Sequence, residues 1–360
     1  MVKIKRFVII RLSSIGDVLH CTPVARALKE KFPSCHITWI VGQVSYPMVE
    51  CNPFIDEVYV WSRERWEKLM RQGKFIEAWQ MWRQLKKDMA KRDFDVALDV
   101  HGLFLSGMVT SATKAPRRIG LGGTKEQNGL FMTEQAPILP QDIHVIQRYL
   151  SVLRPLGITT NHYGMTLSLS DEARRFAAQF LSENGVAPDE KLVIINPATT
   201  WLAKNWPTEF FAQTADVLAS QARIMICGGP GDADLAKKIK ACTNVQIIDA
   251  VGKTSLLEMA ALLEQANLLI VGDTGPLHMA VALGVPTVSV FGATDPAKFG
   301  PLTAGNIVLR SKVGCRPCHK TVCPQKDMRC MRSLRPETVI GAARRVLAAS
   351  HAADINRSDQ

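Results

Sequence analysis

The sequence predicts an α/β protein built from two halves, each organised around a parallel β-sheet. Short apolar runs alternate with longer segments of helical periodicity along most of the 360 residues. This alternation is interrupted at a poorly patterned connector, residues 157–169, and then begins again. Strands that alternate with helices are typical of a parallel sheet covered on both faces. Two such halves joined by a connector predict two domains with a cleft between them.

The composition is that of a globular protein that meets something anionic. Hydrophobic residues make up 47% of the chain and charged residues 21%, which excludes a disordered protein. No apolar run approaches the roughly 18 residues of a membrane span, and Met1–Phe7 is too basic for a signal peptide. We therefore expect a cytoplasmic protein. The net charge of +11 predicts attraction to nucleic acid, a phosphorylated glycolipid or a membrane surface.

The first half contains four clear strand signals. The expected strands are Lys5–Leu12, Ile37–Val41, Val58–Trp61 and Val96–Val100. A Gly16-Asp17 turn links the first of them to a helix over Val18–Lys31. Residues at the carboxyl ends of parallel strands line the ligand site of open α/β sheets. The candidates for binding an acceptor are therefore Gly16, His101, Gly102 and Arg118, with a solvated surface arginine as the alternative for Arg118.

An insertion over residues 62–92 separates the third strand from the fourth. It is predicted to be helical and amphipathic, and it contains Trp66, Trp79 and Trp82 among many basic residues. Two interpretations stay open. The insertion is either an ordinary surface helix with an aromatic inner face or a segment that docks onto lipid or an acceptor.

The second half repeats the alternation. Its expected strands are Lys191–Asn196, Arg223–Cys227, Val245–Ile248, Leu268–Val271 and Thr287–Phe291. A last amphipathic helix, Pro336–Ala349, is expected to pack back on the first domain. The turn Gly272–Gly275 precedes a helix that Asp273 or Thr274 can cap, with Pro276 in its first turn. The free N–H groups and positive dipole end of such a helix favour an anion, most simply a phosphate.

Four motifs in order closely resemble the bacterial lipopolysaccharide heptosyltransferases, glycosyltransferase family 9. The motifs are Ser14-Ile15-Gly16-Asp17, Asn196–Thr200 with Lys204–Pro207, Gly272–His278, and Phe291–Pro296 with Gly300-Pro301. The resemblance implies the GT-B architecture of two Rossmann-like domains. It also implies inverting transfer of L-glycero-D-manno-heptose from ADP-heptose to the lipopolysaccharide inner core.

The resemblance also implies a division of labour along the chain. Residues 1–165 would form an acceptor-binding domain, residues 166–335 an ADP-sugar-binding domain with a cysteine cluster at 315–330, and residues 336–360 a final helix and tail. Asp17 is similar to the family's proposed base, with a pure helix-capping role as the alternative. An aspartate has a pKa of about 3.9, so it must act on a proton made acidic in the transition state or have its pKa raised by burial.

The departing ADP carries negative charge that fixed donors can balance. Lys204 is a catalytic candidate here as well as a donor-binding one. The candidate donor-binding residues are Thr199, Thr200, Lys204, Asp232, Asp273, Thr274, Gly275, Pro276, Leu277 and His278. The loop GGPGD at 228–232 can let a ribose approach, with either Asp232 or Asp234 able to bond a ribose hydroxyl. Neither strand-helix turn carries GxGxxG, which counts against a dehydrogenase, and no acidic cluster of the magnesium-binding kind is present, so catalysis is expected to need no cofactor.

Four cysteines are clustered with the spacing C-x2-C-x4-C-x6-C. Cys315, Cys318, Cys323 and Cys330 can in principle close a tetrahedral structural site for zinc or iron, with His319 able to replace one thiolate. Similar segments occur in some heptosyltransferases, including metal-bearing relatives that modify autotransporters. The alternative is four reduced thiols in a surface loop.

The expected partners are ADP-heptose, a Kdo or heptosyl lipid A acceptor, and the surface of the inner membrane, with no nucleic acid. The basic surface would then hold the enzyme peripherally on the membrane. Two alternatives are a nucleotide-sugar epimerase of the same architecture and a basic, metal-containing protein that binds nucleic acid.

Overall fold

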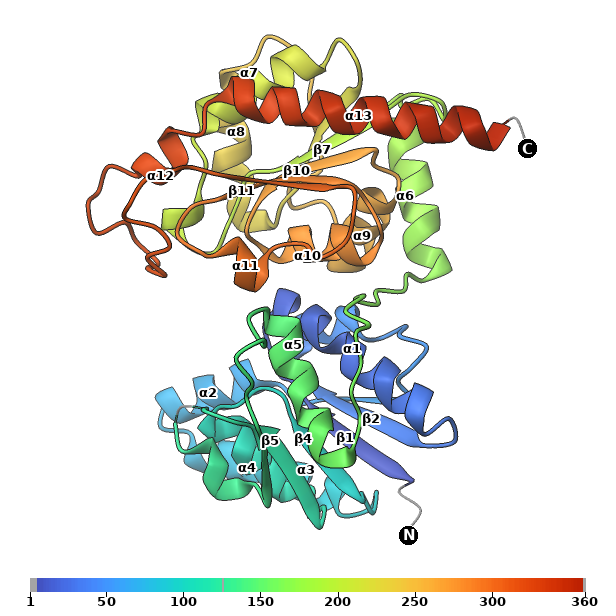
Figure 1. The fold of residues 1–360 in the computed structure, drawn as a ribbon, viewed down its shortest axis with the longest axis vertical. Coiled ribbons are helices and arrows are strands. Elements are labelled where there is room, and N and C mark those ends of the chain that lie inside the picture. Colours follow the sequence, from blue (N-terminus) through green and yellow to red (C-terminus); the bar gives the residue numbers. More distant parts are fainter. Residues whose placement is uncertain (1–4, 125, 359–360) are drawn as a thin grey trace. The chain divides into compact units, whose positions relative to one another are not determined.

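The computed structural model describes residues 5–124 and 126–358, with side chains up to residue 349. The chain forms two compact units, Met1–Ser168 and Leu169–Gln360 (Figure 1). Each unit is a parallel sheet with helices on its faces. Within the described residues, no helix combines the length and apolarity needed to cross a bilayer.

The first unit contains a six-stranded sheet in the order β3-β2-β1-β4-β5-β6. Its strands are β1 (Arg6–Ile10), β2 (His36–Val41), β3 (Glu57–Val60), β4 (Val96–Asp99), β5 (Arg117–Leu121) and β6 (Glu134–Ala136). Its helices are α1 (Ile15–Lys31), α2 (Arg63–Arg71), α3 (Phe75–Met89), α4 (Phe104–Ala112) and α5 (Val145–Leu150), with 3₁₀ turns at Gln43–Met48, Asn128–Phe131 and Ser151–Leu156. The last four residues of β1 are fully buried, as expected for a strand covered on both faces.

The second unit repeats this plan in the order β12-β11-β10-β7-β8-β9. Its strands are β7 (Leu192–Asn196), β8 (Arg223–Ile226), β9 (Ile248–Asp249), β10 (Leu268–Gly272), β11 (Thr287–Phe291) and β12 (Asn306–Arg310). Its helices are α6 (Asp171–Glu183), α7 (Thr208–Leu218), α8 (Ala233–Ala241), α9 (Leu256–Glu264), α10 (Gly275–Ala282), α11 (Pro296–Phe299), α12 (Arg329–Arg332) and α13 (Pro336–Ser358), with 3₁₀ turns at Leu202–Lys204 and Pro230–Asp232.

The strand order gives each sheet one point where its direction of growth reverses. In the first sheet this point lies between β1 and β4, where Ile10 is paired with Asp99. In the second it lies between β10 and β7, where Val271 is paired with Asn196. Ligands of doubly wound sheets bind beyond the carboxyl ends of the strands at such a switch point. The loops that follow β1, β4, β7 and β10 are therefore the expected ligand-binding loops.

The insertion forms two helices rather than one. α2 and α3 are joined by a turn at Gly73, which has a φ of +71°. Trp66 and Trp82 pack against the buried Trp61, at ring-centroid distances of 6.1 and 6.3 Å, whereas the side chain of Trp79 is 57% exposed. An aromatic inner face thus accounts for two of the three tryptophans and leaves the third unexplained.

The last helix packs on the second unit, so the expectation that it returns to the first domain is wrong. α13 contacts α7, β10 and β11, and it runs along this sheet in Figure 1. Its buried residues Val339, Ala342 and Leu347 belong to the same hydrophobic cluster as Ile270 and Val288 of the central strands. The helix covers a face of the second sheet that would otherwise be open to water.

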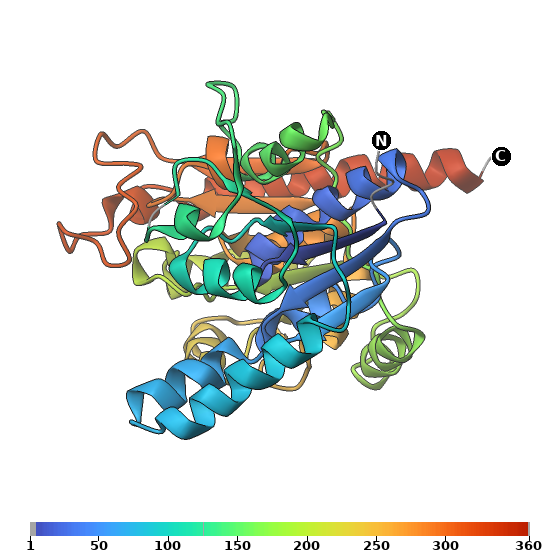
Figure 2. The same ribbon diagram turned by 90° about the horizontal axis from the view of Figure 1, so that it is seen from below.

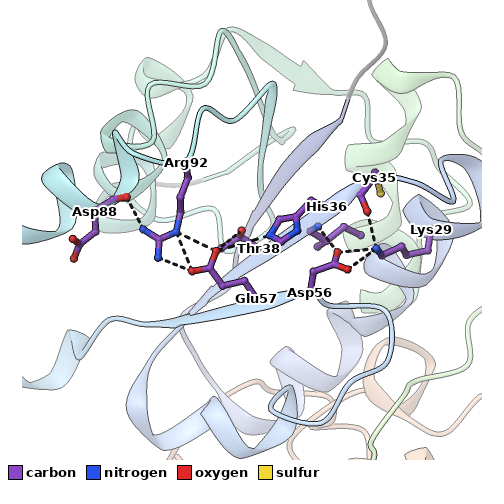
Figure 3. A network of polar contacts seen from close by, with 9 residues as sticks. Lys29, Cys35, His36, Thr38, Asp56, Glu57, Asp88 and Arg92 are labelled. Carbon is purple, nitrogen blue, oxygen red and sulfur yellow. Dashed lines mark hydrogen bonds and ion pairs between the residues drawn. The ribbon is translucent and has the colours of Figure 1, made fainter.

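A charged network fixes the amino-terminal edge of the first sheet (Figure 3). Lys29 Nζ donates to Asp56 Oδ2 at 2.7 Å and to the Cys35 carbonyl at 2.7 Å. Beside it, the Arg92 guanidinium forms a 2.5 Å ion pair with Glu57, the first residue of β3. These contacts tie the loop after α3 to β3, at the end of the strands opposite to Asp17. They serve the fold and not the ligand site.

The position of α13 can be tested by removing part of its buried face. We expect Val339→Ala to lower the free energy of unfolding by about 2 kcal/mol, because Val339 is fully buried and its lost methyl groups leave a cavity. Arg344→Ala, on the exposed face of the same helix, should change it by less than about 0.5 kcal/mol. Guanidinium denaturation measures both. Equal effects of the two substitutions would contradict the observed packing.

Candidate active site

The carboxylate of Asp17 lies at the start of α1, directly after β1, and has three side-chain partners. Arg11 Nη2 is 2.9 Å from Oδ2, the Ser14 hydroxyl donates to Oδ2 at 2.8 Å, and the Tyr149 hydroxyl donates to Oδ1 at 2.8 Å. Ser14 and Asp17 form a capping box, so the capping interpretation holds in part. Arg11 and Tyr149 have no part in capping. They hold a carboxylate whose side chain stays 32% exposed.

These contacts keep Asp17 ionised. Burial alone would raise its pKa, but the charge of Arg11, followed by His20 and the hydrogen bonds it accepts, outweighs burial and holds the pKa of Asp17 well below its ordinary value. Arg11 is itself buried, stacks on the Tyr149 ring at 4.8 Å and donates to the Val100 carbonyl at 2.8 Å. The carboxylate of Asp17 is therefore ionised and weakly basic, and its pKa is not raised by burial.

The loop after β4 brings a neutral histidine near this carboxylate. Burial, followed by repulsion from Arg11 and Arg63, lowers the pKa of His101 to about 3. His101 Nδ1 is buried and has no hydrogen-bond partner among the described residues. The fully buried Asp99 shapes the loop, because its Oδ1 accepts the amides of His101 and Gly102, each at 2.9 Å. The first unit thus brings Gly16, Asp17, His101 and Gly102 to one switch point.

Arg118 does not join this group. It is the second residue of β5, so it lies toward the amino end of the strand, paired with Ala97. Its guanidinium donates to the carbonyls of Phe131 and Ala115, at 2.8 and 2.9 Å. Sequence pattern had suggested a position after a strand end. In the structure this arginine holds two loops together.

In the second unit, the carboxylate of Asp273 joins the loops that follow three neighbouring strands. Lys204 Nζ is 2.7 Å from Asp273 Oδ2, and the Thr294 hydroxyl donates to the same oxygen at 2.6 Å. His278 Nε2 lies 3.8 Å from Oδ1. Burial alone would raise the pKa of Asp273, but the hydrogen bond with His278 and the charge of Lys204 hold this pKa well below its ordinary value. Asp273 therefore orients Lys204, whose ammonium also lies 4.3 Å from the centre of the Trp201 ring.

The start of α10 offers fewer free donors than the sequence suggested. Pro276 has no N–H, and the Leu277 amide donates to the Thr274 carbonyl at 3.1 Å. Thr274 occupies the N-cap position without a side-chain capping bond. Within the described chain, the amides of Thr274 and Gly275 have no acceptor. These two N–H groups lie at the amino-terminal end of α10, where the helix dipole favours an anion.

Three further donor-binding candidates are placed by the structure as follows. Thr199 lies after β7, with its hydroxyl 2.8 Å from the Trp201 carbonyl and 2.7 Å from Asn205 Oδ1, so it stabilises the loop that carries Lys204. Thr200 follows it and is exposed. Asp232 lies after β8, and its Oδ2 accepts the Gly229 amide at 2.8 Å, which closes the glycine-rich loop.

The four clustered cysteines line one cavity of about 140 Å³, together with Ala203 and Ala293. The cysteines are Cys315, Cys318, Cys323 and Cys330, and each has a free thiol. Burial, followed by the neighbouring thiols Cys315 and Cys323, raises the pKa of Cys330. Thiolates suit zinc and iron, yet among the described residues no three His, Cys, Asp or Glu side chains lie in positions to hold a metal ion. The four cysteines therefore share a cavity, but their side chains are not arranged as the ligands of a metal ion.

The cysteine segment also contacts the loops that carry Lys204 and Thr294. The amide of His319 donates to the Ala293 carbonyl at 2.8 Å, and the amide of Ala203 donates to the Thr321 carbonyl at 3.0 Å. Ala203 and Ala293 precede Lys204 and Thr294 in the sequence. The segment therefore supports the two loops that meet at Asp273.

Several residues of these sites were not identified from the sequence. They are Arg11, Asp99, Tyr149, Trp201 and Thr294. Arg11 ends the apolar run of the first strand, and Asp99 occupies a strand end in FDVALDVHG, so a charged residue within a buried strand was the available signal. Tyr149 is 132 residues from Asp17 along the chain, and no local pattern connects them.

Comparison with known proteins identifies the family and the fold of the chain. A family model described as glycosyltransferase family 9 (heptosyltransferase) matches residues 82–329. The lipopolysaccharide core heptosyltransferase OpsX of Haemophilus influenzae is 25% identical, over 82% of this chain and 82% of its own. A family 9 glycosyl transferase from Veillonella parvula is similar in structure, with a TM-score of 0.84 and 26% identity, over 96% of this chain and 98% of that chain. E. coli WaaC, solved with ADP, gives a TM-score of 0.71 at 23% identity, over 91% and 97% of the two chains.

The predicted α/β architecture with two Rossmann-like domains is confirmed by the two parallel sheets and by these structural neighbours. The family match covers more than half of the chain and favours sugar transfer over the epimerase and nucleic-acid-binding alternatives. The chain belongs to glycosyltransferase family 9 (heptosyltransferase) and is a glycosyltransferase of the GT-B fold.

Proposed function

We propose that this enzyme transfers a heptose from ADP-heptose to the inner core of lipopolysaccharide with inversion at the anomeric carbon. The observation that carries the proposal is the ionised, partly exposed carboxylate of Asp17 at the switch point of the first sheet. Relatives named as lipopolysaccharide heptosyltransferases supply the acceptor class, and WaaC, solved with ADP, supports an ADP-linked donor.

In the proposed reaction, Asp17 acts as the base. The acceptor oxygen forms a bond to the anomeric carbon while the bond from that carbon to the diphosphate oxygen breaks, with its electron pair leaving on ADP. The acceptor proton moves to Asp17 Oδ1 or Oδ2. Because Arg11 and Tyr149 make this carboxylate a weak base, proton transfer occurs late, once the attacking oxygen has become acidic. The neutral His101 imidazole, with its unpartnered Nδ1, is suited to hold a sugar hydroxyl nearby.

The second unit is proposed to bind the donor and stabilise the leaving group. The Lys204 ammonium and the amides of Thr274 and Gly275 provide positive charge and donors for the diphosphate. Asp273 and His278 act mainly by orienting Lys204 and the start of α10. Thr199 supports the loop that carries Lys204, Thr200 is free to reach the donor, and Asp232 lies where it can bind a ribose hydroxyl. On this view residues 1–165 bind the acceptor and residues 166–335 the ADP-sugar, with Pro276 and Leu277 shaping the helix start.

The acceptor is proposed to be Kdo or heptosyl lipid A, met at the inner face of the cytoplasmic membrane. The net charge of +11 supports attraction of the enzyme to phosphorylated lipid. The enzyme would then be a cytoplasmic protein that is held peripherally at the membrane.

We expect Asp17→Asn to reduce transfer by about 10²- to 10⁴-fold, because the amide cannot accept the acceptor proton. The assay is mass spectrometry of core-truncated lipopolysaccharides after incubation with ADP-heptose. Binding of ADP, measured by calorimetry, should be unchanged, since the proposed donor residues belong to the other unit. A variant that folds and transfers at the parent rate would rule out Asp17 as the base.

The pH dependence of kcat/KM tests the charge state of Asp17. The base form exists above its pKa and is lost as the pH falls through it, so a depressed pKa places the acid limb below about pH 3.9. Tyr149→Phe removes a hydrogen bond to the carboxylate and should move this limb to higher pH. An unchanged limb in Tyr149→Phe would show that this hydroxyl does not tune the base.

We expect Lys204→Gln to weaken ADP binding by about 10- to 100-fold, because a charge-assisted contact to phosphate is lost. Lys237→Gln, an exposed lysine of α8, is the matched control and should bind ADP normally. Lys204→Gln also removes the lysine that is paired with the buried Asp273 carboxylate. The double variant Lys204→Gln/Asp273→Asn removes that charge as well, so it separates a loss of folding stability from a loss of ADP binding. Normal ADP affinity in a folded Lys204→Gln protein would contradict the proposed role.

We also propose that the cysteine cluster binds a structural zinc or iron ion. The four thiols, which line one cavity, would move closer together around the ion. Elemental analysis of the full chain should then find about one metal per protein. Cys318→Ser/Cys323→Ser should lose it, while Cys242→Ser, an exposed cysteine elsewhere in the unit, should keep it. A metal-free parent of normal stability would refute the metal site.

A further inference from the structure

The helical hairpin of the first unit exposes a group of large apolar side chains at its free end. Figure 2 shows α2 and α3 in blue and cyan, running side by side away from the sheet. In the first turns of α3, Phe75 is 61% exposed, Ile76 74% and Trp79 57%, and Met70 at the end of α2 is 39% exposed. Together these four residues, around the turn at Gly73, are called the hairpin tip below.

The tip is separate from the face that the hairpin buries. Leu69, Ala78, Leu85 and Met89 are buried, and Trp66 and Trp82 pack on Trp61. Phe75 and Trp79 are spaced i, i+4, so they lie together on another face of α3. An amphipathic helix that buries one apolar face normally carries polar residues on its solvent-exposed face, so a second apolar face is unexpected. Large apolar side chains that are exposed together at one end of a hairpin mark an interaction site.

The hairpin that carries the tip has an excess of positive charge. Between residues 63 and 92 there are ten Lys and Arg against four Asp and Glu. Two of the four acids are paired within the hairpin, Glu67 with Arg63 and Glu77 with Lys74, and the Arg83 guanidinium lies 5.3 Å from the centre of the exposed Trp79 ring. Aromatic and aliphatic side chains flanked by cations are the pattern of helices that lie in the interface of an anionic bilayer.

The base of the hairpin is fixed to the sheet. The loop after α3 is held by the ion pair of Arg92 with Glu57 (Figure 3), and the Tyr59 hydroxyl donates to Asp88 at 3.0 Å. At the other end, Arg63 opens α2 and its Nη1 donates to the Ser13 hydroxyl at 3.1 Å. Ser13 directly precedes the Ser14 that bonds Asp17. The hairpin therefore joins the exposed tip to the Asp17 loop through ordered contacts.

We propose that the hairpin tip inserts into the interface of an anionic lipid bilayer and is the membrane-docking surface of this protein. The choice of a lipid bilayer as the partner depends only on features of the hairpin, its excess of positive charge and its exposed apolar side chains. The consequence for catalysis, presentation of a lipid-linked acceptor to the Asp17 loop, rests on the proposed function.

The test is sedimentation of the full-length protein with vesicles of dioleoylphosphatidylglycerol or dioleoylphosphatidylcholine. The parent should bind the anionic vesicles and bind the zwitterionic ones at least about tenfold more weakly. Ile76→Ser/Trp79→Ser should lower binding to the anionic vesicles by about tenfold or more, because two side chains that enter the interface are lost. Leu130→Ser/Val217→Ser, which also removes two exposed apolar side chains, is the control and should bind as the parent does.

Fluorescence quenching by lipids brominated on their acyl chains gives a second readout. Quenching of tryptophan fluorescence should be strong in the parent and fall markedly in Trp79→Phe, because the other two tryptophans of the hairpin, Trp66 and Trp82, pack on Trp61. Equal vesicle binding by Ile76→Ser/Trp79→Ser, absence of vesicle binding by the parent, or a tip that captures a protein and not lipid would each overturn the proposal. The vesicles contain neither donor nor acceptor, so failure of the transfer reaction would leave this result intact. Transfer to acyl-free core oligosaccharide should be unchanged in Ile76→Ser/Trp79→Ser.

Discussion

The buried guanidinium of Arg11 is the constraint on which the candidate site of the first unit depends. A buried cation is costly unless it is paired and hydrogen-bonded. Here Asp17 pairs with Nη2, the Val100 carbonyl accepts from Nη1 and the Tyr149 ring stacks on the guanidinium, while Nε has no partner among the described residues. The same contacts fix the carboxylate in one orientation and keep it charged. Position and charge state of Asp17 thus come from one set of interactions, which links β1, α1 and α5.

The second unit also contains a buried charged group held by partners of opposite charge, but here the buried group is negative. There the buried group is the Asp273 carboxylate, and Lys204, Thr294 and His278 converge on it from separate segments. In both units the pair lies where the strand order reverses, so the fold itself brings the loops together. One unit leaves a carboxylate partly exposed and the other presents an ammonium group with free helix amides. Those are the two kinds of group that sugar transfer from a diphosphate requires.

The sequence was most informative where a strand is buried on both faces. Thr287–Phe291 was predicted residue for residue, because its β-branched and aromatic residues are typical of a strand and Gly284-Val285-Pro286 marks where the preceding helix ends. The shorter β6 and the partly exposed β12 gave no comparable signal, and β9 spans only Ile248–Asp249 although Val245–Ile248 was expected. The period of α13 showed which face is apolar but not which sheet it would cover.

The candidate site was predictable to the extent that its residues sit in short local motifs. Asp17, Lys204 and Asp273 follow strand ends within recognisable turns, whereas Arg11 and Tyr149 reach Asp17 through tertiary contacts that no spacing encodes. Arg118 shows the converse, since a basic residue near a glycine turned out to bind backbone carbonyls. Cysteine spacing likewise predicted proximity around one cavity but not the distances between thiols.

The central claim is inverting heptosyl transfer, and the anomeric configuration of the product tests it most directly. Purified enzyme would be incubated with ADP-heptose and core-truncated lipopolysaccharide, and the one-bond carbon–hydrogen coupling at the anomeric position would be compared by NMR in donor and product. The account predicts a product larger by one heptose with the configuration opposite to that of the donor. Retention of configuration, or release of free heptose without transfer, would contradict it.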